Sequence, residues 1–247
     1  MKLLADFGNT RLKWAQSSDT GLANHGALSY NMDNIALSIE SAMRSLEKPD
    51  EILVASVAGE EVSSAFEVFC QSRWSMRPRF VVVSEQLAGV SNGYESSHEL
   101  GIDRWLAVVA AWQKYRMPVC VIDCGTALTI DLVDENACYV GGYIIPGVDL
   151  MIQSLSKNTQ QINVSEIDSF SMTPGLRTVD CVVHGAIAAS VSTIKLVLEQ
   201  TRNNWCGDVR IIMTGGFAEE ISAHLGENID MDPWLVLHGL NLMAGDG

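Results

Sequence analysis

The chain has 247 residues, 47% of them hydrophobic, which is enough to build one large domain or two modest ones around a sizeable core. Its formal net charge is −14, and such a surface repels nucleic acid and anionic membranes, since both are bound through Lys and Arg. Apolar stretches such as 105–112 are far shorter than the roughly 20 residues that span a bilayer. We therefore expect a cytoplasmic protein that binds neither nucleic acid nor membrane.

The six cysteines are spread along the chain with no C-x-x-C pair and no histidine at zinc-binding spacing. We expect them to be reduced and mostly buried, as is usual in the cytoplasm. They are Cys70, Cys120, Cys124, Cys138, Cys181 and Cys206.

The first predicted element is a hairpin with a polar, glycine-bearing tip. Strand-like runs at 2–5 and 12–15 flank the tip Asp6-Phe7-Gly8-Asn9-Thr10. Further along, helical patterns alternate with strand-like runs, so the first half is predicted to be a sheet flanked by helices. The expected helices are 34–46 and 61–72, and the expected strands are 52–57 and 79–83.

The same hairpin design returns half a chain length later. Strand-like runs at 119–122 and 128–133 flank the tip Asp123-Cys124-Gly125-Thr126-Ala127. This repetition predicts two similar α/β domains, 1–116 and 117–247. The second is expected to continue with a strand at 139–145, a long helix at 179–199, and a strand at 209–213 that ends in Thr214-Gly215-Gly216.

Both tips have the features of phosphate-binding loops. A glycine in a tight turn lets backbone N–H groups approach a phosphate closely, and the carboxylates Asp6 and Asp123 would hold Mg²⁺, through water, or another cation. Either tip alone is also typical of a structural turn. Their duplication favours a pair of loops that binds a triphosphate.

Several neighbouring side chains are candidates for the same phosphates. Thr126 is the threonine that we expect to donate to a phosphate oxygen, whereas Thr10 and Thr129 have weaker claims and Thr129 equally suits a strand. Lys13 either contacts a phosphate or lies solvated on its strand. The chain has neither a Walker A loop nor the motif set of protein kinases.

A third motif, Gly101-Ile102-Asp103-Arg104, opens a helix with apolar residues at helical spacing. Asp103 is either a cap stabilised by the helix dipole or the acceptor of a proton from an alcohol. Arg104 is either part of a salt bridge or a planar fork for a substrate carboxylate. Tyr94, in the preceding turn, is a candidate for the same pocket.

Three further residues have structural interpretations. Thr178 precedes the long helix and is expected to be its N-cap. His98 and His184 are expected to be packed or surface side chains, because neither has a nucleophile beside it in the sequence.

These motifs together resemble those of type III pantothenate kinases, and the resemblance runs from the first loop to the segment 214–218. It implies an α/β fold of two similar ribonuclease H-like domains of the actin/hexokinase/Hsp70 type, with a nucleotide cleft between them. It also implies transfer of the γ-phosphoryl of ATP to pantothenate, giving 4′-phosphopantothenate on the route to coenzyme A.

The resemblance further implies roles for individual residues. Asp103 would be the general base, Asp123 would bind K⁺ or NH₄⁺, and Asp6 would hold Mg²⁺ through water. Members of the family are dimers, so Thr178 would reach the pantothenate of one subunit or the other. The implied ATP contacts are Asp6, Phe7, Gly8, Asn9, Thr10, Arg11, Leu12, Lys13 and Thr126, and the implied pantothenate contacts are Tyr94, Gly101, Ile102, Asp103, Arg104 and Thr178.

Phe7 departs from the family, which has a smaller aliphatic residue there, and 20–49 carries no familiar motif, so the adenine contacts stay unassigned. Two alternatives remain open: a kinase with the same fold for another small alcohol or sugar, and a nucleotide-binding regulatory protein without turnover.

Overall fold

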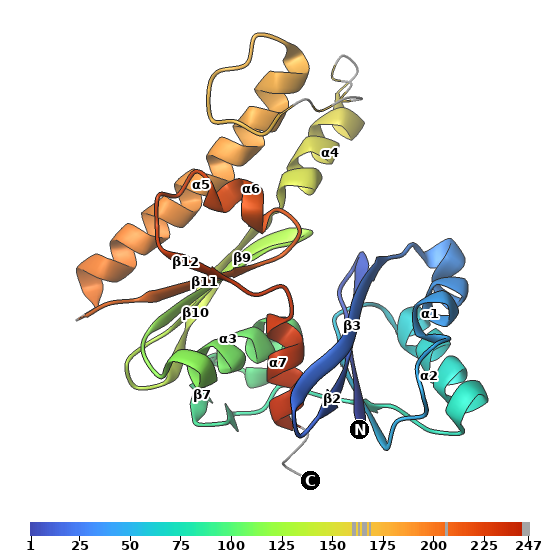
Figure 1. Cartoon of the computed structure of the whole chain (residues 1–247). Coiled ribbons are helices and arrows are strands. Elements are labelled where there is room, and N and C mark those ends of the chain that lie inside the picture. The colour runs from blue at the N-terminus through green and yellow to red at the C-terminus, as the bar shows by residue number, and fades with distance from the viewer. Residues whose placement is uncertain (160–161, 163, 165–166, 168, 206, 244–247) are drawn as a thin grey trace. The chain divides into compact units, whose positions relative to one another are not determined.

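The computed structural model describes residues 1–159, 162, 164, 167, 169–205 and 207–243, and the chain divides into two compact units (Figure 1). The first unit combines Met1–Lys114 with the segment that begins at Trp234, and the second is Tyr115–Pro233. The C-terminal segment, which we expected in the second domain, thus belongs to the first unit.

The first unit contains a five-stranded sheet in the order β3-β2-β1-β4-β5. Strand β2 is antiparallel to both β1 and β3, whereas β1, β4 and β5 run parallel to one another. Its elements are β1 Lys2–Phe7, β2 Arg11–Ser18, β3 Gly21–Ser29, the 3₁₀-helix η1 Met32–Asn34, α1 Ile35–Met43, β4 Glu51–Ser56, α2 Glu60–Trp74, β5 Arg79–Phe80, the short antiparallel strands β6 Gln86–Leu87 and β7 Val90–Asn92, the 3₁₀-helix η2 Ser97–Glu99, α3 Ile102–Tyr115 and α7 Leu235–Leu242.

Alternating side chains of β1 face two layers of helices. Leu3, Ala5 and Phe7 belong to a hydrophobic core with α1 and α2, and the Phe7 ring packs edge-on against Phe66 of α2 at 5.0 Å between centroids. Leu4, on the other face, is also buried, and α7 contacts β1, β2 and β4. Helices therefore cover both faces of this sheet.

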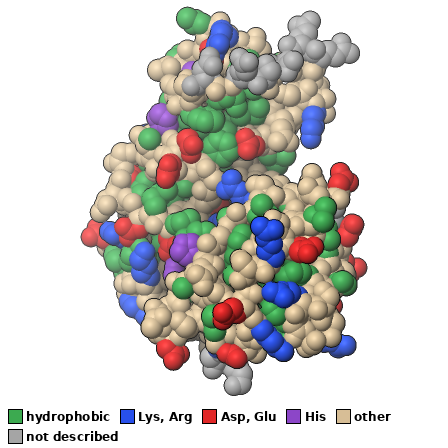
Figure 2. Space-filling view, turned by 45° about the vertical axis from the view of Figure 1, so that its right-hand side comes forward, with side chains coloured by type: hydrophobic (Ala, Val, Ile, Leu, Met, Phe, Trp, Pro, Cys, Tyr) green, Lys and Arg blue, Asp and Glu red, His purple; other side chains and the backbone are tan. Residues whose placement is uncertain are grey.

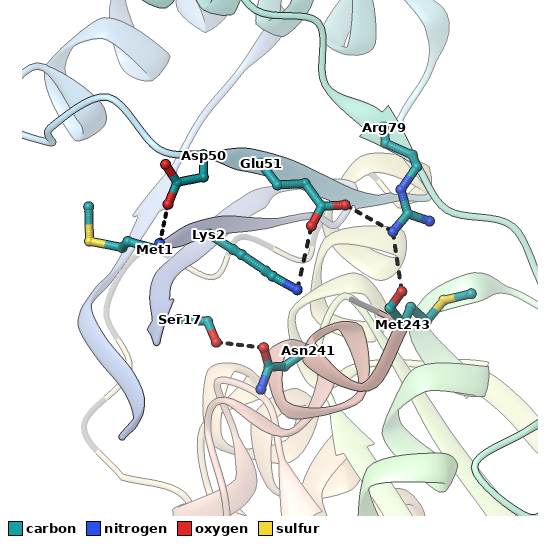
Figure 3. Close-up of polar contacts among 8 residues, drawn as sticks. All are labelled: Met1, Lys2, Ser17, Asp50, Glu51, Arg79, Asn241 and Met243. Atoms are coloured by element: carbon teal, nitrogen blue, oxygen red, sulfur yellow. Dashed lines mark hydrogen bonds and ion pairs between the residues drawn. The ribbon is translucent and has the colours of Figure 1, made fainter. Parts of the chain in front are cut away.

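Polar contacts hold the end of α7 on the first unit (Figure 3). Ser17 donates to the side-chain oxygen of Asn241, and the Arg79 guanidinium donates to the Met243 carbonyl at 3.2 Å. Glu51 lies between Lys2 and Arg79, with nitrogen-to-oxygen distances of 3.5 and 3.1 Å. These contacts explain why a segment so late in the sequence joins the first unit.

The second unit repeats the strand arrangement of the first. Its strands stand in the order β12-β11-β8-β9-β10, with β9 antiparallel to β8 and β10, and with β8, β11 and β12 parallel. Its elements are β8 Val119–Cys124, β9 Ala127–Val133, β10 Cys138–Pro146, α4 Val148–Asn158, α5 Thr178–Asn204, β11 Arg210–Thr214, α6 Ala218–Ser222 and β12 Ile229–Met231.

When the strands of each unit are numbered in chain order, both units have the order third, second, first, fourth, fifth across the sheet. The parallel and antiparallel pairs also correspond. The duplication that we inferred from two loops therefore extends to five strands in each unit. In both units the predicted hairpin is formed by the first two strands.

Helix α5 forms the core of the second unit, where it packs beside α4 (Figure 1). Ile187, Val191 and Ile194 are fully buried in its hydrophobic cluster. Among the described helices, α5 alone is long and apolar enough, by length and composition, to cross a membrane, with a mean hydropathy of 1.8. This helix is longer than the apolar stretches that the sequence indicated. Burial of one of its faces in the core of the second unit accounts for its apolar composition.

The five described cysteines are free thiols. Cys70, Cys120 and Cys124 are buried, and burial raises the pKa of each thiol, so they stay neutral and unreactive. Cys181 is exposed, and Cys206 lies outside the described residues.

Candidate active site

The first loop is a tight hairpin tip between β1 and β2. The Gly8 amide donates to the Arg11 carbonyl at 3.0 Å, which closes the turn. Asn9, Thr10 and Arg11 are exposed at the tip. The backbone and side chains of this turn are thus available to a ligand.

Tyr30 supports the first loop from β3's end, a role the sequence did not reveal. Its amide donates to the Thr10 carbonyl at 3.1 Å, and its hydroxyl donates to the Gly8 carbonyl. Burial, and secondly the Asp6 carboxylate, raise the pKa of Tyr30, so the hydroxyl keeps its proton for that hydrogen bond. The tyrosine therefore fixes the loop from behind.

Three of the predicted nucleotide contacts in this loop have buried side chains. The side chains of Phe7 and Leu12 are buried in the hydrophobic core, so their backbone atoms are the part that can meet a nucleotide. Asp6 is also buried, at 8% exposure, and pairs in register with Lys13 on β2.

The second loop places the Asp123 carboxylate between two glycines. A Cβ atom at Gly215 would fall 2.6 Å from Asp123 Oδ1, and one at Gly125 would fall 3.1 Å from it. Gly215 also has a φ of +99°, a conformation that favours glycine. Gly215 is therefore needed for this carboxylate to lie where it does, and Gly125 gives it room that a larger residue would narrow.

Helix α4 begins directly against the second loop. Gly147, its N-cap, donates its amide to the Thr126 carbonyl at 3.0 Å. The exposed Thr126 thus lies at the N-terminus of a helix, where backbone amides and the helix dipole favour an anion.

Gly147→Ala is expected to displace the second loop, because the new Cβ would lie 2.3 Å from the Gly125 carbonyl oxygen and 2.6 Å from that of Thr126. Overpacking of this kind costs about 1–3 kcal/mol. We expect a lower melting temperature and weaker ATP binding by calorimetry. Gly59→Ala is the matched control: Gly59 is the N-cap of α2 with nearly the same backbone angles, but its added Cβ meets nothing within 4 Å. Equal effects of the two changes would refute the explanation.

The third motif forms a compact cluster at the start of α3. The Arg104 amide donates to Asp103 Oδ1 at 2.8 Å, and the Arg104 guanidinium donates to the Tyr94 hydroxyl at 3.1 Å. A Cβ at Gly101 would fall 2.6 Å from Asp103 Oδ1. The structure thus brings together four residues that the sequence singled out: Tyr94, Gly101, Asp103 and Arg104.

Asp103 and Arg104 differ in burial. Arg104 is only 7% exposed, whereas Asp103 is half-buried in the first turn of the helix, as the sequence predicted. Ile102, between Gly101 and Asp103, turns its side chain into the interior. A half-buried carboxylate beside a buried guanidinium can take a proton from one end of a small molecule whose other end is anionic.

The predicted N-cap role of Thr178 is wrong. Thr178 is the first residue of α5, and the N-cap is Arg177, whose guanidinium makes two hydrogen bonds to Asp180. Thr178 instead lines a cavity of about 440 Å³ between α4 and α5. His184 is buried and bonded to the Thr173 carbonyl, in agreement with a packed side chain, and His98 is exposed.

Comparison with known proteins agrees with this arrangement. A sequence profile of the type III pantothenate kinase family matches residues 2–200. A type III pantothenate kinase from Nitrosococcus oceani is 32% identical over 100% of this chain and 94% of its own length, and one from Cellvibrio japonicus is 35% identical over 98% and 96%. Among solved structures, a conserved Baf family protein from Campylobacter jejuni has a TM-score of 0.59 at 20% identity, with 99% of this chain and 98% of that chain covered.

The structural likeness shows the fold, and with the two sheets described above it confirms the mixed α/β fold of the actin and sugar-kinase type. The profile covers both hairpin loops and the Gly101–Arg104 motif, and the relatives match along nearly their full length. The chain belongs to the type III pantothenate kinase family.

Proposed function

We propose that this protein transfers the γ-phosphoryl group of ATP to the primary hydroxyl of pantothenate, giving 4′-phosphopantothenate and ADP in the first step of coenzyme A synthesis. The main structural support for this proposal is the cluster at the start of α3. Hydrogen bonds hold Asp103, Arg104 and Tyr94 together there.

The cluster suits a hydroxy acid as acceptor. Arg104 binds the pantothenate carboxylate, with Tyr94 fixing the guanidinium through the 3.1 Å hydrogen bond. Asp103 orients the primary hydroxyl and accepts its proton as the oxygen bonds to the γ-phosphorus. The bond from that phosphorus to the bridging oxygen of ADP breaks in the same step, and the proton later leaves Asp103 for solvent.

The two loops supply the nucleotide contacts. The amides around Gly8 and the N-terminus of α4 at Thr126 bind phosphate oxygens, and Lys13 adds a positive charge. These are preorganised groups, so most of the rate acceleration comes from position and electrostatics.

Cations complete the site. Mg²⁺ and a monovalent cation neutralise phosphate charge when bound. Asp6 is the residue that would hold Mg²⁺, through water, and Asp123 is the residue that would hold K⁺ or NH₄⁺. The position of the Asp123 carboxylate between Gly125 and Gly215 supports such a site, because each glycine leaves room that a Cβ would fill.

The second unit supports a homodimer. The cavity beside Thr178 is lined by apolar side chains of α4 and α5, including Met151, Leu155 and Val182, and hydrophobic side chains gather over these helices in the upper part of Figure 2. A second subunit would bury them, and Thr178 would then contribute to a pantothenate site near that interface. The buried free thiols support a cytoplasmic location.

The test is ADP release by the purified protein with ATP, Mg²⁺ and K⁺, with and without pantothenate. We expect release that requires pantothenate and that falls when Na⁺ replaces K⁺. Sugars and other small alcohols, offered at the same ATP concentration, are the control acceptors. Release that is independent of pantothenate, or that responds to a sugar instead, would overturn the assigned substrate.

A further inference from the structure

The surroundings of Asp123 differ from those of its counterpart in the first unit. Asp6 on β1 pairs in register with Lys13 on β2 and with Ala55 on β4. Asp123 on β8 occupies the same place in its sheet, but it pairs with Thr129 on β9 and with Thr214 on β11. One half thus surrounds its carboxylate with a lysine and an alanine, and the other with two hydroxyl groups.

Thr214 and Asp123 lie on the same face of the second sheet. Side chains alternate along a strand, and Cys124 and Met213, their neighbours in sequence, both enter the hydrophobic cluster under α5. Asp123 and Thr214 therefore point to the opposite face, at the carboxyl ends of two parallel strands.

The Thr214 hydroxyl has no hydrogen-bond partner within the described protein although the residue is only 2% exposed. A buried hydroxyl without a partner costs free energy and needs an explanation, and a bound ion that the hydroxyl contacts is one such explanation. The fold itself does not require it, because alanine occupies the equivalent place at position 55 in the first unit.

We infer that the Thr214 hydroxyl is a ligand of a monovalent cation held at Asp123, and that it helps to select that ion. One carboxylate and neutral hydroxyl oxygens give a site of low charge, which suits K⁺ better than a divalent ion, since Ca²⁺ and Mg²⁺ sites use additional carboxylates or phosphates. The described residues contain no group of three or more His, Cys, Asp or Glu side chains able to hold a metal.

This inference rests on the proposed cation at Asp123 and adds a reason for its location. In the first unit Lys13, a basic residue, occupies the register position beside Asp6. In the second unit Thr129 stands at that position, which offers a neutral oxygen ligand instead.

The test is the effect of K⁺ on the melting temperature of the full chain with MgATP, in mixtures of KCl and choline chloride at constant ionic strength. We expect K⁺ to raise the melting temperature of the unaltered protein. Thr214→Val, which keeps the shape and removes the hydroxyl, should increase the half-saturating K⁺ concentration about tenfold or more. Thr214→Ser should restore the response, and Thr214→Ala replaces the valine variant if that one does not fold.

Thr201→Val is the matched control, because Thr201 is a buried threonine of α5 whose hydroxyl donates to the Val197 carbonyl at 2.8 Å. It should lower the melting temperature in every salt and leave the K⁺ response unchanged. An unaltered K⁺ response in Thr214→Val, or the lack of one in the unaltered protein, would overturn the inference. Pantothenate-dependent ADP release, measured on the unaltered protein, reports separately on the proposed function.

Discussion

Asp103→Asn is expected to lower the turnover number with pantothenate by about 10² to 10⁴, the range typical of a lost general base. The amide keeps the shape of the side chain, and its oxygen can still accept the 2.8 Å hydrogen bond from the Arg104 amide. What it loses is the ability to accept the proton from the pantothenate hydroxyl. The steady-state rate of ADP release, measured at saturating ATP and pantothenate, checks this result.

Two further measurements separate loss of chemistry from loss of structure. ATP affinity by calorimetry and the melting temperature should both be unchanged in Asp103→Asn, because the residue is half-buried and its contact with Arg104 is retained. Asp149→Asn, in the first turn of α4 and exposed, is the control for removing a carboxylate from a helix start. Normal turnover in Asp103→Asn would remove this residue from the role of base.

Gly239→Ala is expected to have the largest effect on stability. The Cβ atom would lie 2.0 Å from the Leu106 carbonyl oxygen and 2.6 Å from its carbon, both in the backbone of α3. No side-chain rotation relieves such a contact, so α7 must move away from α3. The cost exceeds the gain of about 1 kcal/mol for alanine over glycine in a helix, and we expect a net loss of about 2 kcal/mol.

This loss corresponds to a fall in melting temperature of about 4–8 °C for a protein of this size, measurable by calorimetry. Turnover should fall as well, because Leu106 lies within one turn of Asp103 and Arg104, and a displacement of about 1 Å costs roughly 10² in rate. Gly185→Ala is the control in another helix, since nothing lies within 4 Å of its added Cβ. Unchanged stability in Gly239→Ala would show that the two helices separate without strain.

Much of the fold could be predicted because clear strand patterns flank both hairpin tips, and because the two tips repeat half a chain length apart. The strands that flank both tips have apolar residues bounded by glycine and aspartate, and these signals located β1, β2, β8 and β9 to within a few residues. The duplicated tips then gave the two-fold design of the chain. The first turn of α3 was also located correctly.

Other elements lacked such signals. Strand β3 is mostly exposed, so it has no regular alternation of apolar residues, and β5 covers only two of the five positions expected. Helix α7 was missed as an element. Its membership of the first unit depends on contacts with β1, β2 and β4, from which the second unit separates it in sequence, and no local pattern reveals such contacts.

Two contacts that support the candidate site could not be predicted from the sequence either. Tyr30, just after β3, donates to the Gly8 carbonyl, and Gly147, at the start of α4, lies against the backbone of the second loop. Neither residue belongs to a sequence motif that would indicate its contact with a loop.

The order in which the ribosome makes these segments has a consequence for the first unit. The strands β1, β4 and β5 are synthesised early, yet the helix that covers Leu4 on their second face, α7, follows the entire second unit. During synthesis this apolar face lacks α7, and exposed apolar surface of that kind promotes aggregation. A truncated chain that ends near residue 114 should therefore aggregate, whereas linking the α7 segment directly after it should restore a compact unit.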